Sequence, residues 1–456
     1  MSGRTVERPE DLREILSIPF SDEQLAVIAA PLEPGVVIAA AGSGKTTVMA
    51  ARVVWLVGTG QVRADQVLGL TFTRKAAAEL SNRVTTALSG SGIIDAAALE
   101  NSEAQTITTY DSFAGQLVSE HAPRIGIDPA EHRLTDATRY RLAAQVVAAN
   151  EFPLVALGEW NDRRLIGALL GLDTMMTQHM VTGQRIEEFT ADYVGGLDEA
   201  PLWRGAPYRA VVDAERVAAE RLELLGLVES YRRAKDRLGW VEFADLMAQA
   251  ATIAERAPEV STMLREQYRV LLLDEYQDTS SAQATLLTTL FSGPTVAEGR
   301  GHPVTAVGDP YQSIYGWRGA AASNIAEFPT SFPKADGTAA NAYSLRVNRR
   351  SGPEILDGAN VVAQGLQSDP AMPHLPGVDF TLHAAPGQEP ATVTTRHFTS
   401  SDEELDWIAD DIAARGALEG YAGIAVLVRR NATIEPLFRR LSARDVPTEI
   451  VGLAGL

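Results

Sequence analysis

The stretch Val36-Val37-Ile38-Ala39-Ala40-Ala41-Gly42-Ser43-Gly44-Lys45-Thr46 decides which fold class the sequence predicts. It begins with β-branched residues, continues through a turn rich in small residues, and leads into a helix-like run at residues 47–56. A strand, a glycine-rich turn and a helix start, in that order, are typical of a P-loop. Because parallel strands are joined through covering helices, this stretch predicts an α/β fold with a parallel sheet.

The turn has the composition that nucleotide phosphates require. Small residues let backbone N–H groups approach phosphate oxygens, and the N-terminus of the following helix adds its positive dipole. We expect Lys45 to reach the β- and γ-phosphates of ATP, and the hydroxyl of Thr46 to bind Mg²⁺. The residues predicted to bind ATP are Ala41, Gly42, Ser43, Gly44, Lys45, Thr46 and Thr47. A plain glycine-rich turn is the alternative, because the leading position is Ala39 instead of glycine.

A nearly continuous apolar run at residues 269–273 ends in the acidic pair Asp274 and Glu275. Such a run is typical of a strand buried on both faces, and ligands bind at the carboxyl ends of strands in open α/β sheets. We therefore expect Asp274 to hold Mg²⁺, directly or through water, and Glu275 to orient and deprotonate the attacking water. Taken in isolation, the pair could instead cap a helix.

Strand-like and helix-like patterns divide the chain into three parts. We expect residues 1–118 and 239–350 to form a first sheet domain, residues 119–238 a helical insertion, and residues 351–456 the beginning of a second sheet domain. The expected strands are Val36–Ala40, Val67–Thr73, Arg269–Asp274, Val304–Gly308, Ala391–Phe398 and Ile424–Val428. The clearest helices expected in the insertion are Ala137–Ala149 and Tyr208–Arg237.

Composition excludes several classes of protein. The 456 residues, 45% hydrophobic and 22% charged, are those of a globular protein, and no apolar run reaches the ~18 residues needed to cross a bilayer. The absence of cysteine excludes disulfides and thiolate metal sites here, which fits a cytoplasmic protein. A net charge of −19 argues against whole-surface attraction to nucleic acid, but a local groove of aromatic and cationic residues is compatible with it.

Further motifs, in a fixed order from Phe20 onward, resemble those of the UvrD/Rep/PcrA superfamily 1 DNA helicases over nearly the whole chain. Residues 20–24, Phe-Ser-Asp-Glu-Gln, resemble the Q motif of the family, which implies that Gln24 reads the adenine edge. Residues 70–77 and 108–113 resemble its next elements, of which the first contacts DNA, and residues 241–246 are similar to the segment just before the acidic pair. The resemblance implies a RecA-like P-loop sheet with a helical insertion and the start of a second RecA-like domain.

The string Val307-Gly308-Asp309-Pro310-Tyr311-Gln312-Ser313-Ile314-Tyr315-Gly316-Trp317-Arg318-Gly319-Ala320 carries the most specific resemblance. It implies that Gln312 senses the γ-phosphate and that Tyr315 and Trp317 stack on bases, a contact that tolerates any base sequence. Without the flanking string, the two aromatics would read as core residues. The predicted DNA contacts are Thr71, Thr73, Arg74, Lys75, Thr109, Tyr110, Ser112, Phe113, Tyr315, Trp317 and Arg318.

Residues 345–351 resemble the L-x-x-N-Y-R-S element of the family. By resemblance, Arg350 reaches the γ-phosphate and stabilises charge in the transition state. Arg349 stands where the family has a tyrosine that stacks on adenine, and a guanidinium can also stack on a base. A solvated face, or simple phosphate contacts, would be the alternative for this arginine cluster.

The leading hypothesis is an enzyme: an ATP-dependent 3′-to-5′ DNA helicase or translocase of repair or recombination, cytoplasmic and nucleoid-associated, acting on single-stranded DNA or its junction with duplex. One alternative is a truncated module that binds nucleotide and DNA without turnover, or that partners another helicase; another is a P-loop ATPase acting on RNA or protein. Intact Lys45, Asp274, Glu275 and Arg350 favour the enzyme.

The later motifs of the family do not follow Ile424–Val428. We therefore expect them beyond Leu456, and expect this polypeptide alone to hydrolyse ATP or unwind DNA poorly. The long helical insertion and the Ala/Arg usage resemble AdnA/AdnB helicase–nuclease motors, which implies a second helicase or nuclease subunit as a partner.

Overall fold

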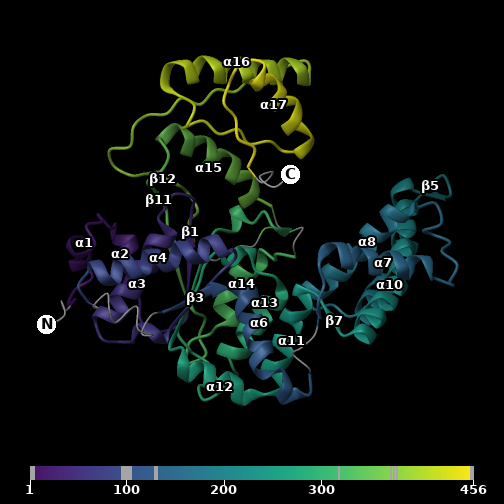
Figure 1. Ribbon diagram of the computed structural model, residues 1–456, viewed down its shortest axis with the longest axis horizontal. Helices are drawn as coiled ribbons and strands as arrows, with labels where there is room; N and C mark the ends of the chain where they lie inside the picture. Colours follow the sequence, from purple (N-terminus) through teal and green to yellow (C-terminus); the bar gives the residue numbers. More distant parts are fainter. Residues whose placement is uncertain are drawn as a thin grey trace. The chain divides into compact units, whose positions relative to one another are not determined.

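The computed structural model describes residues 6–93, 105–127, 132–316, 319–369, 372, 375 and 378–451 (Figure 1). Trp317 and Arg318, two of the predicted DNA contacts, lie outside the described residues. The chain divides into two compact units, Met1–Ala391 and Thr392–Leu456. Residues 351–391, which the sequence pattern assigns to a second sheet domain, thus belong to the first unit. No helix in the described ranges is long and apolar enough to cross a membrane.

The first unit is built on a six-stranded sheet in the order β10-β1-β9-β8-β2-β3, in which every neighbouring pair is parallel. This confirms the predicted α/β fold. The strands are β1 (Gly35–Ala39), β2 (Val67–Thr71), β3 (Thr106–Thr109), β8 (Val270–Leu273), β9 (Val304–Gly308) and β10 (Asn341–Leu345). The four strands expected in this unit are present within two residues at each end, whereas β3 and β10, at the two edges, are not predicted.

Alternate residues of the central strands point to opposite faces of the sheet, and each face has its own apolar core. Val37 and Ala39 of β1 pack into one core, and Val36 and Ile38 into the other. The first core is covered by α1 (Asp11–Ile15), α2 (Asp22–Ile28), α3 (Lys45–Gly58) and α4 (Arg74–Gly90) (Figure 1). The second is covered by α6 (Tyr110–His121), α11 (Phe243–Arg256), α12 (Pro258–Gln267), α13 (Ser281–Phe291) and α14 (Ser323–Ser331).

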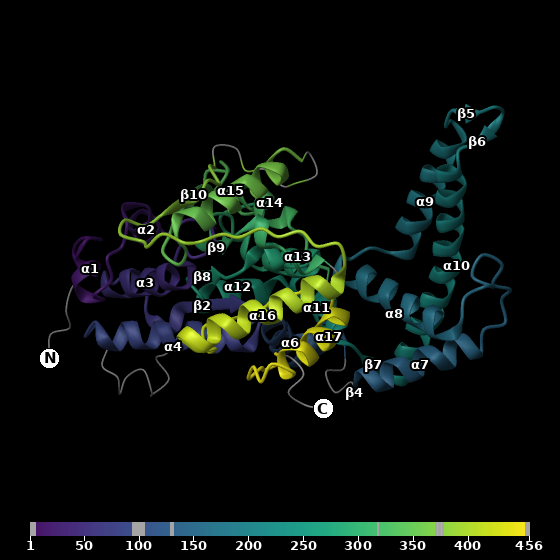
Figure 2. The ribbon, with the colours of Figure 1, turned by 90° about the horizontal axis from the view of Figure 1, so that it is seen from above.

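The helical insertion has a core of its own, in which Leu142, Leu169, Leu225 and Tyr231 are buried. It consists of α7 (Asp136–Ala148), α8 (Asp162–Gln178), α9 (Gly183–Asp198) and α10 (Arg209–Leu238). Figure 2 shows α9 and α10 side by side, joined at one end by the short strands β5 (Leu202–Trp203) and β6 (Ala206–Pro207). The two helices expected here, at residues 137–149 and 208–237, are confirmed as α7 and α10.

The chain enters the insertion through β4 (His132–Arg133) and leaves it through β7 (Trp240–Val241). These two short strands pair with each other in parallel. Directly after β7, the buried carboxylate of Glu242 lies 2.6 Å from Nε of Arg139 on α7 and 3.4 Å from Nζ of Lys235 on α10. Because desolvating these charges costs about as much as their attraction returns, the cluster orients the insertion more than it adds net stability.

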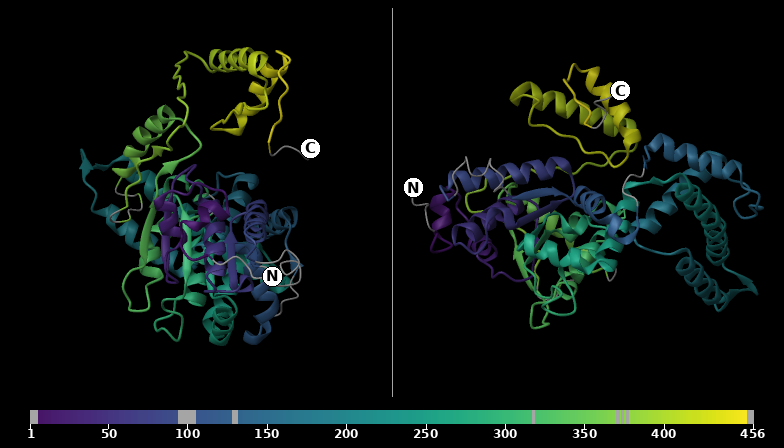
Figure 3. Two further views of the ribbon diagram at one scale, coloured as in Figure 1. Left: turned by 90° about the vertical axis from the view of Figure 1, so that its left-hand side faces the viewer. Right: turned by 60° about the horizontal axis from the view of Figure 1, so that its bottom comes forward.

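The second unit contains α16 (Ser401–Glu419) and α17 (Ile434–Ser442), which pack through Leu405, Ala409 and Leu437 (Figure 3). The strands expected at Ala391–Phe398 and Ile424–Val428 are wrong, because neither segment has regular secondary structure or ladder pairing. A strand needs a neighbour to pair its backbone groups, and the described part of the chain offers none to either segment.

Arg52 of α3 is buried between the first helices and the sheet. Its guanidinium donates hydrogen bonds to the carbonyls of Val27, Ile28, Ala30 and Pro31, which follow or end α2, and to the hydroxyl of Thr305. Burial lowers the pKa of Arg52 to about 10, so the group stays protonated at neutral pH. This one side chain therefore supplies hydrogen-bond donors to the carbonyls at the C-terminal end of α2 and connects that end to β9.

We expect Arg52→Met to lower the free energy of unfolding by about 3 kcal/mol, because several buried carbonyls lose their donor at once. Urea denaturation followed by circular dichroism measures the change. Arg63→Met is the matched control, since Arg63 is exposed and forms an exposed ion pair with the neighbouring Asp65, and it is expected to cost less than ~0.5 kcal/mol. Equal unfolding free energies for the two variants would contradict the role of Arg52.

Candidate active site

The loop between β1 and α3 has the shape of an anion cradle. Gly42 and Gly44 have φ angles of 69° and 84°, in the left-handed region that favours glycine. A Cβ on Gly42 would lie only 2.7 Å from Nδ2 of Asn348. The loop delivers the chain into the N-terminus of the 14-residue helix α3, whose first backbone N–H groups have no partner within the helix. Glycine is therefore required here, and the open helix end is suited to phosphate.

A segment more than 300 residues later in the sequence is hydrogen-bonded to this loop. Nδ2 of Asn348 donates to the carbonyl of Ala41 at 2.7 Å, and the backbone N–H of Arg349 donates to the carbonyl of Gly42 at 2.9 Å. Oδ1 of Asn348 also accepts from the backbone N–H of Arg350. These bonds bring the two predicted arginines to the edge of the cradle, where both side chains are exposed.

The two residues predicted to contact adenine lie next to each other. Gln24 completes a capping box at the start of α2, and its Nε2 donates to the carbonyl of Ser43 at 2.9 Å. The guanidinium of Arg349 donates to the carbonyl of Pro19 at 2.7 Å and lies 3.5 Å from Oε1 of Gln24. The Q-motif segment, the cradle and Arg349 therefore form one contiguous site.

Lys45 and Glu275 form an ion pair across the carboxyl edge of the sheet. Nζ of Lys45, at the start of α3, lies 2.9 Å from Oε2 of Glu275. Their strands β1 and β8 flank β9, so parallel pairing brings the two ends together. Glu275 has a φ of 47°, which is uncommon for a residue with a Cβ, and strain of this kind clusters at functional sites.

Asp274 directly follows β8 and is buried at its carboxyl end. Its backbone N–H donates to the carbonyl of Leu70, only 5% of the residue is exposed, and Oδ1 has no hydrogen-bond partner among the described residues. Burial, reinforced by the charge of Glu275, raises the pKa of Asp274 to about 6. A buried carboxylate oxygen without a partner fits a hard cation such as Mg²⁺. The half-buried Thr46 follows Lys45 in the first turn of α3.

The segment after β9 is organised by the carboxylate of Asp309. Its Oδ1 accepts from the backbone N–H of Tyr311 at 3.0 Å, and its Oδ2 accepts from Nε2 of Gln312 at 2.6 Å. Burial raises the pKa of Asp309. The predicted γ-phosphate sensor Gln312 is thus held in a short 3-10 turn, Pro310–Gln312, at the same edge of the sheet as Lys45 and Glu275.

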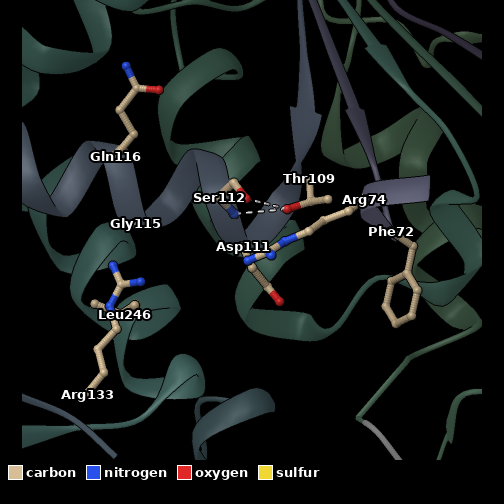
Figure 4. Close-up of a pocket in the computed structure, with 9 residues that line it drawn as sticks. All are labelled: Phe72, Arg74, Thr109, Asp111, Ser112, Gly115, Gln116, Arg133 and Leu246. Atoms are coloured by element: carbon tan, nitrogen blue, oxygen red, sulfur yellow. Dashed lines mark hydrogen bonds between the residues drawn. The ribbon is translucent and has the colours of Figure 1, made fainter. Parts of the chain in front are cut away.

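A pocket of about 550 Å³ opens at the ends of β2 and β3 (Figure 4). It is lined by Phe72, Arg74, Thr109, Asp111, Ser112, Gly115, Gln116, Arg133 and Leu246. Thr109 caps α6, where its Oγ1 accepts from the backbone N–H of Ser112 at 3.1 Å and donates to the hydroxyl of Ser112. The lining combines an aromatic ring, two arginines and hydroxyls, a composition suited to a phosphate backbone and its bases.

The ring of Phe72 lies 5.0 Å from that of Tyr315, so the pocket borders the segment that follows β9. Among the predicted DNA contacts, Thr73, Arg74, Lys75 and Ser112 are exposed and Tyr315 is half-buried. The other four in the described ranges are buried, namely Thr71, Thr109, Tyr110 and Phe113, and of these Thr109 lines the pocket. Tyr110 donates its hydroxyl to the carbonyl of Asp274.

Comparison with known proteins agrees with this geometry. Residues 20–333 match the family described as UvrD/REP helicase N-terminal domain. The chain belongs to this family. It is 29% identical over 345 residues to the ATP-dependent DNA helicase PcrA of Staphylococcus aureus (strain NCTC 8325 / PS 47), which covers 75% of this chain and 40% of that protein.

Two other relatives give the same assignment. DNA helicase II of Haemophilus influenzae is 28% identical over 350 residues, covering 77% of this chain and 41% of that protein. PcrA of Leuconostoc citreum is 26% identical over 441 residues, covering 96% of this chain and 50% of that protein. The chain therefore spans half or less of the length of these relatives.

The sequence assigns no role to four residues of this UvrD/REP site. They are Phe72, Gln277, Asp309 and Asn348. Three of them act through hydrogen bonds to segments distant in sequence, and Phe72 acts through its packing on Tyr315. The available signal was position, because each lies within three residues of an assigned residue.

Proposed function

We propose that this chain carries the ATP-hydrolysing site of a DNA helicase. The observation that carries the proposal is the ion pair of Lys45 and Glu275, which lies beside the glycine cradle and the buried carboxylate of Asp274, whose Oδ1 has no partner among the described residues. Phosphoryl transfer requires a positive charge at the phosphates, a general base and a carboxylate that binds a cation. Lys45, Glu275 and Asp274 would supply these three groups at one edge of the sheet. The names of the relatives, ATP-dependent DNA helicases, support the same activity.

The chemistry follows from the partners of Glu275. When ATP binds, its β- and γ-phosphates would attract Lys45 away from Oε2 of Glu275, which leaves that carboxylate without its cation and able to orient water and accept its proton. Gln312 and Arg350 would contact the γ-phosphate and stabilise the charge that develops on it. Thr46 and Asp274 would hold Mg²⁺, which supplies further charge neutralisation at the phosphates when bound.

At the other end of the nucleotide, Gln24 and Arg349 are proposed to hold the adenine. Beyond its bond to Ser43, the amide of Gln24 still has one N–H, which can donate to an acceptor on the edge of a purine. The exposed guanidinium of Arg349 offers a planar surface for stacking. The remaining predicted cradle residues, Ala41 to Thr47, would contact the phosphates.

The pocket beside Phe72 is proposed to bind single-stranded DNA. Arg74 and Arg133 supply positive charge, and the Phe72–Tyr315 pair supplies aromatic surface for bases. The 3′-to-5′ polarity, the junction of single- and double-stranded DNA, and a role in repair or recombination are proposed from the resemblance. We also propose that the sequence after residue 350 contributes the beginning of a second RecA-like domain.

ATP hydrolysis by the full-length protein, measured with and without a single-stranded oligonucleotide, tests the function directly. We expect hydrolysis that single strands stimulate, and unwinding of duplexes with a 3′ tail in preference to those with a 5′ tail. Hydrolysis that single-stranded DNA leaves unchanged would exclude the coupled motor, and preference for the 5′ tail would reverse the proposed polarity.

Phe72→Ala is expected to weaken single-strand binding by about 10-fold, because loss of one stacking surface costs ~1–3 kcal/mol. Affinity for ATP should be unchanged, since Phe72 lines the strand pocket and not the cradle. Fluorescence anisotropy with a labelled oligonucleotide measures the first, and titration with a fluorescent ATP analogue the second. Phe189→Ala, at an exposed ring on α9, is the matched control. A Phe72→Ala protein that binds single strands as tightly as wild type would refute the strand pocket.

A further inference from the structure

Gln277 is a buried amide that connects two parts of the proposed motor. Only 1% of the residue is exposed. Its Nε2 donates to Oε2 of Glu275 at 2.9 Å, and its Oε1 accepts from the backbone N–H of Asp309 at 3.0 Å. A single carboxamide therefore joins the proposed general base to the first residue after β9.

The contact with the segment after β9 leaves little freedom at Gln277. A Cβ on Gly308 would lie 2.3 Å from Oε1 of Gln277, so only glycine fits at that position. The hydroxyl of Ser313 donates to the backbone carbonyl of Gln277 at 3.2 Å. Because two separate bonds hold Gln277 to residues 309–313, a displacement of that segment displaces Gln277 as well.

The same segment leads to the proposed strand contacts. Two residues beyond Ser313 is Tyr315, whose ring packs on Phe72 at the edge of the strand pocket. Earlier in this segment, directly after β9, the carboxylate of Asp309 accepts a hydrogen bond from the side-chain amide of Gln312. Seven consecutive residues thus link the amide of Gln277 to the γ-phosphate sensor and to the aromatic pair.

We infer that Gln277 is a positioning residue that sets the orientation of Glu275 according to the position of residues 309–315. This inference rests on the proposed ATP hydrolysis. Lys45 and Gln277 are the two hydrogen-bond partners that the described residues give the Glu275 carboxylate. Once phosphate attracts Lys45 away, Gln277 is the hydrogen-bond partner of the Glu275 carboxylate that remains among these two. Strand binding at Tyr315 therefore acts on the general base through Gln277, which makes DNA a stimulator of hydrolysis.

Two substitutions distinguish the hydrogen bond that Gln277 makes to Glu275 from the one that it makes to Asp309. Gln277→Glu keeps an oxygen that accepts from Asp309 but loses the donor to Glu275 and adds a like charge beside it. Gln277→Met keeps the length of the side chain and loses both bonds. For both variants we expect the DNA-stimulated kcat to fall about 100-fold, the effect of a general base displaced by about 1 Å, while the KM for ATP changes less than about 3-fold.

The matched control is Asn324→Ser. Asn324 is also a buried amide that holds neighbouring backbone, through donors to Thr279 and Ser280, but it does not contact Glu275. We expect this variant to lose stability while keeping its kcat and its stimulation by DNA within about 3-fold of wild type. A residue with a merely structural role would not produce the split between kcat and KM expected for Gln277.

Hydrogen exchange of the 304–314 peptide supplies a readout independent of turnover. We expect the amide of Asp309 to exchange at least about 10-fold faster in Gln277→Met, and to stay protected in Gln277→Glu, which keeps the acceptor. If wild type hydrolyses ATP and both Gln277 variants match its kcat and DNA stimulation, the inference is overturned while the proposed function stands. If wild type itself fails to hydrolyse ATP, the proposed function fails and the inference falls with it.

Discussion

Glu275→Gln is expected to reduce DNA-stimulated ATP hydrolysis by about 1,000-fold while ATP still binds. A general base contributes typically ~10²–10⁴-fold, and an amide cannot accept the proton of the attacking water. The substitution keeps the size of the side chain, and a carboxamide oxygen can still accept from Nε2 of Gln277. Single-turnover hydrolysis of radiolabelled ATP measures the rate, and equilibrium titration with a fluorescent ATP analogue measures the affinity.

ATP affinity in the Glu275→Gln protein should equal or exceed that of wild type. Nζ of Lys45 lies 2.9 Å from Oε2 of Glu275, and removing the charge of Glu275 leaves Lys45 more available to phosphate. Glu33→Gln is the control, because Glu33 precedes β1 at the opposite, amino edge of the sheet, where it accepts from Asn341. If the Glu275→Gln protein hydrolysed ATP at the wild-type rate, another residue would have to be the base.

Lys45→Ala is expected to lower kcat/KM for ATP by about 100- to 1,000-fold and, unlike Glu275→Gln, to weaken nucleotide binding. The ammonium group contributes in both the ground state and the transition state, because it faces phosphate before and during transfer. The variant also leaves Glu275 without its cation. Steady-state hydrolysis and analogue titration together separate this double loss from the loss of the base alone.

Lys334→Ala controls for the loss of one lysine, since Lys334 lies in the turn before β10, at the amino edge of the sheet. It should retain wild-type kcat/KM and ATP affinity. Unchanged turnover in Lys45→Ala would show that the cradle between β1 and α3 does not bind the hydrolysed nucleotide, and the proposed site would have to be abandoned.

The strands that the sequence predicted correctly are those buried on both faces. β1 and β8 are continuous apolar runs because helices cover both sides of the sheet at its centre, so pattern and burial coincide. The two missed strands, β3 and β10, are the edges of the sheet. Their sequences, TITT and NAYSL, are mixed in polarity because an edge strand is only partly buried, which removes the signal.

Exposure was the least predictable property of the candidate site. A motif match located Thr71, Tyr110 and Phe113 within the proposed DNA-contacting elements, but all three are buried. Local sequence cannot distinguish the side of a helix or strand that meets solvent from the side that meets the core when both carry polar and aromatic residues. The adjacent Phe72, whose ring lines the pocket, could only be separated from them by the packing of β2.

The amino-acid sequence alone determined the phosphate cradle, the acidic pair and the order of the motifs, because these depend on residue types at short, fixed spacings. Tertiary structure alone decided which of these groups meet: Lys45 with Glu275, Asn348 with the cradle, and Gln277 with Asp309. The physical reason is that parallel strands distant in sequence end at one common edge. Hydrogen bonds across that edge join residues 32 to 307 positions apart, a distance over which no local pattern extends.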